Sequence, residues 1–247
     1  IAPDIAKQWH PIKNGKIKPE NVIAHGHKKY WWKCEKGPDH EFEQSISFYE
    51  KSAEVDFNET VVISIVKVSM HIKKWQKVLD WLNLLSNKKG LDNNLKIQQA
   101  IAYREVHEVE KSLRIFSELY EDKYLNRNFY ISYGFTLNRI GKYKEAIKIY
   151  TAGLKQFTDD FHLNYNAGIT YTNLFDYDAA EKLLISASKL NPKIIDLWLT
   201  LASCQTQLRK FENAKESIDI AREIDPKNKL ITFQEATFRM QIGENNE

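Results

Sequence analysis

The chain has 247 residues, of which 43% are hydrophobic and 28% charged, and its formal net charge is +3. This usage excludes a disordered chain, and the longest apolar run, residues 61–66, is too short to cross a bilayer. Two cysteines, Cys34 and Cys204, exclude a disulfide scaffold and predict a reducing, cytoplasmic location, while the low glycine and proline contents favour helices.

Residues 1–46 are dense in tryptophan and in turn-forming residues. They include the strings YWWKC (30–34) and GPDHEF (37–42). These strings resemble a probable zinc-ribbon, treble-clef-like domain of bacterial and phage-related proteins. The resemblance implies a small β segment in which Cys34 and His40 supply the first two metal ligands.

A structural zinc site needs four ligands. In the resembled family a later Cys-Pro-x-Cys motif supplies the last two, and this chain has no such motif. His10, His25 and His27 are alternatives, but their spacing does not demand a metal. Zinc is therefore expected only if residues outside this sequence complete the ribbon.

Charge is distributed unevenly at this end of the chain. Residues 1–36 hold eight lysines against three acids, whereas residues 37–58 hold one lysine against six acids. A basic segment of this kind is either a solvated loop or a surface for a polyanion such as nucleic acid. The lysines that would contact nucleic acid are Lys13, Lys16, Lys18, Lys28, Lys29 and Lys33.

The segment 47–58 resembles the second helix of a repeat whose first helix is missing. We therefore expect that two pieces of a longer polypeptide meet between Ile46 and Ser47. The rest of the ribbon, and any catalytic domain, would then lie outside this sequence.

The strongest pattern is an internal repeat of 34 residues. Gly134 and Gly168 are separated by this interval, and Ala202 follows after the same interval. Within a unit, apolar residues recur at steps of three and four, which predicts two helices joined by a turn. The five units are 59–92, 93–126, 127–160, 161–194 and 195–228.

These units resemble tetratricopeptide repeats. In the third unit the family's motif is matched by Tyr130, Tyr133, Gly134, Leu137, Gly141, Tyr143, Ala146 and Tyr150. In the fifth unit it is matched by Trp198, Leu201, Ala202, Phe211, Ala214, Ala221 and Pro226. The first two units match less well, because Val66 and Ser112 stand where small residues are usual. The resemblance implies an all-α fold, a superhelical solenoid of about five helix-turn-helix repeats with an end helix.

Residues 229–247 continue the register as one more first helix. Glu235 occupies a position where a core leucine is usual. This favours a capping helix, since a stack of repeats needs a polar end. A truncated sixth repeat is the alternative.

In this family the first helix of each unit lines a concave surface. The columns that face it are largely apolar in this chain, and they do not reproduce the clamp with which some members bind a C-terminal carboxylate. The resemblance implies a groove for an apolar peptide or helix of a protein partner, with packing against another part of the same polypeptide as the alternative. The predicted groove residues are Ile63, Lys67, Ile97, Ile101, Ile131, Phe135, Tyr165, Ile169 and Leu199.

The sequence contains no phosphate-binding loop or hydrolase motif. Glu105, His107 and Glu108 cluster on an expected turn, which favours a solvated turn over a catalytic site. We therefore predict a non-enzymatic interaction scaffold. The alternatives are a nucleic-acid-associated protein and the regulatory or assembly part of a larger enzyme, such as a nuclease or glycosyltransferase, since fold analogy decides none of these. Abundant Lys, Asn and Ile with little Arg indicate an AT-rich, bacterial source.

Overall fold

The computed structural model describes residues 49–50, 53 and 58–243. Over these residues the regular structure is helical throughout, so the predicted all-α solenoid is confirmed there. The expected β segment and zinc ribbon lie outside the described residues. Among the described helices, none is long and apolar enough to span a membrane.

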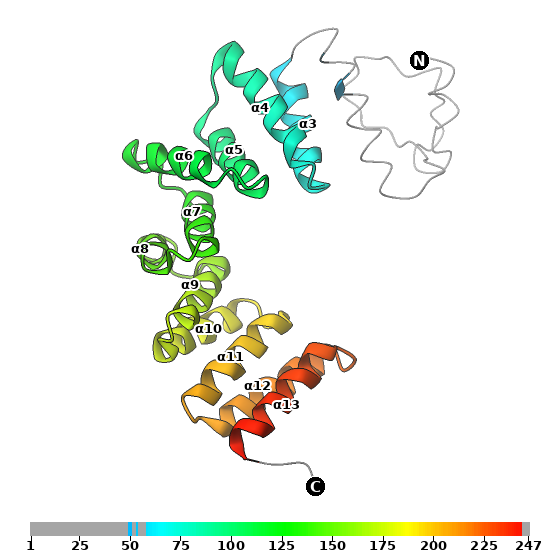
Figure 1. The fold of residues 1–247 in the computed structure, drawn as a ribbon, viewed down its shortest axis with the longest axis vertical. Coiled ribbons are helices and arrows are strands. Elements are labelled where there is room, and N and C mark those ends of the chain that lie inside the picture. The colour runs from blue at the N-terminus through cyan, green and yellow to red at the C-terminus, as the bar shows by residue number, and fades with distance from the viewer. Residues whose placement is uncertain (1–48, 51–52, 54–57, 244–247) are drawn as a thin grey trace, which may run out of the picture. The chain divides into compact units, whose positions relative to one another are not determined.

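The helices follow one another as hairpins (Figure 1). The described part of the chain divides at Asp92, so that α3 and α4 belong to a first unit and α5 to α13 to a second. The first unit contains α3 (Glu59–His71) and α4 (Trp75–Lys89). The second contains α5 (Asn93–Glu105), α6 (Val109–Glu121), α7 (Arg127–Arg139), α8 (Tyr143–Leu154), α9 (Phe161–Asn173), α10 (Tyr177–Leu190), α11 (Ile195–Gln207), α12 (Phe211–Ile224) and α13 (Lys229–Ile242).

The turn inside each hairpin has the same backbone geometry. One residue per turn has a positive φ, between 57 and 77°, and its successor donates its N–H to the carbonyl five residues earlier. This is the Schellman motif, in which glycine is the usual residue because it lacks a Cβ. Only one of the five turns uses glycine, yet all five close in the same way. The positive-φ residues are Lys73, His107, Gly141, Phe175 and Arg209.

The two helices of the third hairpin pack closely because one of them carries a glycine at the crossing. A Cβ on Gly134 in α7 would lie 2.4 Å from Cε1 of Tyr150 in α8. Gly168 in α9 lies similarly against Leu184 of α10, where a Cβ would come within 2.8 Å of Cγ. The small residues of the 34-residue pattern therefore mark where a neighbouring side chain fills the space.

The first helices of the second unit lie on its inner side. Helix α5 contacts α7, α7 contacts α9, α9 contacts α11, and α11 contacts α13. Among these described hairpins, the second helices α6, α8, α10 and α12 contact first helices but make no comparable contacts with one another. In a curved stack the elements on the inner arc are the closest together, so the first helices line the concave face. Figure 1 shows α6 and α8 on the opposite side of the stack from α5, α7 and α9.

The end helix α13 carries a charged residue, Glu235, on the side that faces α12. Glu235 in α13 accepts hydrogen bonds from Arg222 of α12 and from Arg239 of α13. The Glu235 carboxylate is thus paired without burial in a core. This arrangement suits a capping helix, which stays a prediction.

Candidate functional site

The predicted groove residues of the second unit occupy neighbouring first helices. Phe135 is 39% exposed, whereas Ile97 is buried at 3% and belongs to the core. The others in this unit are half-buried, a degree of exposure that leaves part of each side chain open to a partner. These half-buried residues are Ile101, Ile131, Tyr165, Ile169 and Leu199. In the first unit, Ile63 is half-buried and Lys67 is exposed.

The apolar groove residues form a column along successive first helices, which we call the apolar column. This column continues into α13, where the sequence analysis predicted no groove residue. Phe233 follows Leu199 by one interval of 34 residues and is 72% exposed. Leu230 and Met240, on the same helix, are 57% and 77% exposed. The repeat interval was a signal that could have found Phe233, because it had already placed the other members of the column.

An open hollow of about 360 Å³ lies at this end of the concave face. One of its lining residues is Leu199, a predicted groove residue. The other lining side chains are polar, so the hollow offers hydrogen-bonding groups beside an apolar side chain. The lining residues are Thr172, Asp196, Leu199, Thr200, Ser203 and Gln234.

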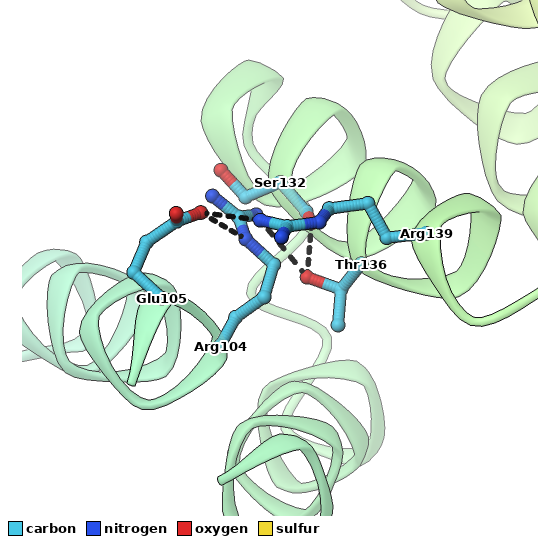
Figure 2. A network of polar contacts seen from close by, with 5 residues as sticks. All are labelled: Arg104, Glu105, Ser132, Thr136 and Arg139. Carbon is cyan, nitrogen blue, oxygen red and sulfur yellow. Dashed lines mark hydrogen bonds and ion pairs between the residues drawn. The ribbon is translucent and has the colours of Figure 1, made fainter. Parts of the chain in front are cut away.

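A polar network joins the last turns of α5 and α7 (Figure 2). The Oε1 atom of Glu105 accepts hydrogen bonds from Nε of Arg104 at 2.8 Å and from Nη1 of Arg139 at 2.9 Å. Arg104 also donates through Nη1 to Oγ1 of Thr136 at 3.3 Å. Thr136 in turn donates to the carbonyl oxygen of Ser132 at 2.8 Å. Two guanidinium groups from neighbouring repeats therefore share one carboxylate.

The network adjoins the apolar column. The guanidinium carbon of Arg104 lies 4.8 Å from the centroid of the Phe135 ring, within the range of a cation–π interaction. The Arg104 side chain is only 10% exposed, and burial lowers the pKa of its guanidinium. Partial burial acts to raise the pKa of the Glu105 carboxyl, but the hydrogen bonds and charges of Arg104 and Arg139 outweigh it and hold that pKa below its usual range.

The lowered pKa of Glu105 predicts a pH dependence of stability. Because the folded pKa lies below the unfolded value of about 4.3, the Glu105 carboxylate contributes stability above that pH and loses it as pH falls through the folded pKa. In Glu105→Gln the difference in unfolding free energy between pH 6 and pH 3 should therefore be smaller than in the parent protein. Urea unfolding at both pH values measures this difference.

The matched control for this prediction is Glu145→Gln, which removes a carboxylate that is 53% exposed and whose ion pair among the described residues is with Lys142. It should leave the pH dependence close to that of the parent. An equal change in both variants would show that Glu105 has no special role in acid stability.

The remaining candidate residues differ in how far the structure describes them. Cys34, His40 and the lysines expected to contact nucleic acid lie outside the described residues. Within the described part of the chain, no group of three or more His, Cys, Asp or Glu side chains could hold a metal ion. Cys204 is fully buried, with its Sγ 3.2 Å from Oγ1 of Thr172, and burial raises the pKa of its thiol.

Family models match two parts of the chain. Residues 161–194 and 195–228 match the model of the tetratricopeptide repeat. Residues 5–52 match the model of a probable treble clef zinc finger domain. The BBSome complex member BBS4 of Bos taurus is 31% identical over 85 residues, which are 34% of this chain and 16% of that protein. The match thus spans about a sixth of the length of that curated relative.

Solved structures resemble the solenoid at low sequence identity. A tetratricopeptide repeat protein from Parabacteroides merdae has a TM-score of 0.64 at 14% identity, over 81% of this chain and 75% of that one. YrrB, described as having an unusual peptide-binding site, has a TM-score of 0.59 at 14% identity, over 76% of this chain and 97% of that one. A MamA structure has a TM-score of 0.57 at 18% identity, over 74% of this chain and 97% of that one. At these identities the likeness shows the fold alone.

Proposed function

Because the chain carries an array of tetratricopeptide repeats, we propose that it is a non-enzymatic scaffold whose concave face binds an apolar peptide or helix of a partner protein. The observation that carries this proposal is the apolar column on the contacting first helices. It includes two aromatic side chains that are 39% and 72% exposed, Phe135 and Phe233. YrrB, a protein of the same fold, has a peptide-binding site, and this likeness adds support.

The energetics of this surface favour a protein ligand. Burial of apolar area contributes about 25 cal/mol per Å², and exposed aromatic side chains are frequent anchors in protein interfaces. The half-buried residues Ile131 and Tyr165 pack against core clusters, so they lose little side-chain freedom on binding. The surface is therefore preorganised for an apolar segment.

The polar network supports a binding role over a catalytic one. Of the clustered residues Glu105, His107 and Glu108, Glu105 takes part in the network. Its carboxylate forms ion pairs with two guanidinium groups. A carboxylate held in this way, with its pKa lowered, is a poor proton acceptor. This favours a structural or binding role for Glu105.

The test compares two substitutions of groove residues by glutamate. Random dodecapeptides displayed on phage are first selected on the immobilised protein, and the affinity of a selected peptide is then measured by fluorescence anisotropy. Phe135→Glu should weaken binding by about tenfold or more, since it removes a central aromatic anchor. Ile101→Glu should weaken it in the same direction.

The matched control is Tyr120→Glu, because Tyr120 is 50% exposed but lies on a second helix, α6. Circular dichroism establishes that the variants are folded. Unchanged affinity in folded Phe135→Glu, or equal losses in Phe135→Glu and Tyr120→Glu, would refute binding at the concave column.

A second candidate function involves the N-terminal segment. The match of residues 5–52 to a probable treble clef zinc finger domain favours it, as does the basic charge of residues 1–36. Under this proposal the segment contacts nucleic acid, and DNA binding should weaken as salt rises and disappear on deletion of residues 1–46. Zinc would be held by Cys34 and His40 with two ligands that the family's motif does not supply in this chain, so we assign zinc no step in either function.

A further inference from the structure

We propose that Arg139, held by Glu105 beside the buried Arg104, binds an acidic side chain of the partner, so that the recognised motif pairs an Asp or Glu with an apolar residue. The inference rests on the proposed function, since it names the chemistry of a peptide on the same concave face. It concerns the last turns of α5 and α7, where the polar network meets Phe135.

The charges of this network do not balance. Arg104 and Arg139 carry two positive charges, and both pair with the single carboxylate of Glu105. Among the described residues, no other carboxylate forms an ion pair with either guanidinium. The network therefore has one positive charge more than it has negative charges. A carboxylate from a ligand would neutralise this excess charge.

Arg139 is the member of the network that a ligand can reach. Its side chain is 40% exposed, compared with 23% for Glu105 and 10% for Arg104. An arginine has five N–H donors in a planar fork, and the hydrogen bond to Glu105 uses one of them. The remaining donors can bind a carboxylate in the two-bond geometry that guanidinium groups favour.

The bond to Glu105 also orients Arg139 in advance. A long surface side chain ordinarily loses rotamer freedom when it binds a ligand, and this loss weakens binding. Because Glu105 is itself held by the buried Arg104, the position of Arg139 is fixed by α5 as well as by its own helix. An acidic ligand would therefore meet a cation that is already in place.

The position of Phe135 couples the acidic residue to an apolar one. The Phe135 ring packs against Arg104, which in turn shares Glu105 with Arg139. A peptide that covers Phe135 with an apolar side chain therefore has a neighbouring residue close to Arg139. This geometry predicts an acidic residue near an apolar residue in the bound segment.

The experiment repeats the phage selection on three proteins: the parent chain, Arg139→Glu and Arg127→Glu. The displayed peptides are fused at their C-termini, so that every enriched carboxylate belongs to a side chain. Arg127 is the matched control, because it lies on the same helix, is 43% exposed and also pairs with a carboxylate, that of Asp160. The parent and Arg127→Glu should enrich acidic residues beside apolar ones. Arg139→Glu should keep the apolar preference and exchange the acidic residue for lysine or arginine.

A milder variant gives a second readout that does not depend on reversing a charge. Arg139→Gln should weaken the binding of a selected acidic peptide by about tenfold. It should also make the affinity for that peptide depend less on salt concentration. Apolar enrichment without an acidic preference, or the same acidic preference in Arg139→Glu, would overturn this inference and leave the proposed function standing. No enrichment on any of the three proteins would overturn both.

Discussion

Replacing Phe116 by alanine should lower the free energy of unfolding by about 4 kcal/mol, the cost of removing a large buried aromatic side chain. Phe116 lies in α6 and is completely buried. Its ring stacks on Tyr133 at 5.2 Å between centroids and meets the edge of Phe129 at 6.1 Å. Because both partners belong to α7, the substitution removes contacts between two successive hairpins. Urea unfolding followed by circular dichroism measures the loss.

Unfolding of the Phe116→Ala variant should also be less cooperative, since each repeat is stabilised chiefly by its neighbours and this variant weakens the contact between two of them. The control is Phe175→Ala, which removes the same aromatic ring from a turn where it is 77% exposed. That variant should change the unfolding free energy by about 0.5 kcal/mol or less. Comparable losses in the two variants would contradict the packing described for α6 and α7.

The second large effect is expected from Gly134→Ala. The added Cβ would lie 2.4 Å from the buried ring of Tyr150, which is far inside van der Waals contact. Overpacking of this kind costs about 1–3 kcal/mol or more, and the better helix propensity of alanine returns about 1 kcal/mol. We expect a net loss of about 1–2 kcal/mol, measured by the same unfolding experiment.

A double-mutant cycle identifies the cause of this loss. In a Tyr150→Leu background the ring is absent, so Gly134→Ala should cost less than it does in the parent chain. If the cost is the same in both backgrounds, the clash with Tyr150 is not the reason that glycine occupies this position.

The repeated interval predicted the helical hairpins even where the family motif is weak. Val66 and Ser112 depart from the usual small residues, yet both are fully buried in hairpins of the expected kind. The hairpins still form at the 34-residue interval because the turn and the packing of the two helices depend on many positions at once. The departure has a cost at Ser112, whose buried hydroxyl has no hydrogen-bond partner among the described residues.

The polar network could not be predicted from the sequence. The sequence favours a solvated turn for Glu105, although Arg139 follows it by one repeat interval and therefore lies at the same position of the next first helix. The interval identifies equivalent positions on neighbouring helices, but it does not predict the conformations of long side chains at those positions. The burial of Arg104 is likewise invisible in the sequence, because arginine is rarely buried unless it is paired.

The most direct test of binding at the concave face uses the isoleucine methyl groups as reporters of the two sides of the stack. Ile101, Ile131 and Ile169 lie in the concave column, whereas Ile147, Ile149 and Ile185 lie on second helices. With isoleucine methyl-labelled protein, addition of a selected peptide should shift the NMR signals of the first three residues and leave those of the last three in place. Shifts confined to the second-helix isoleucines would contradict the claim that the concave face is the binding surface.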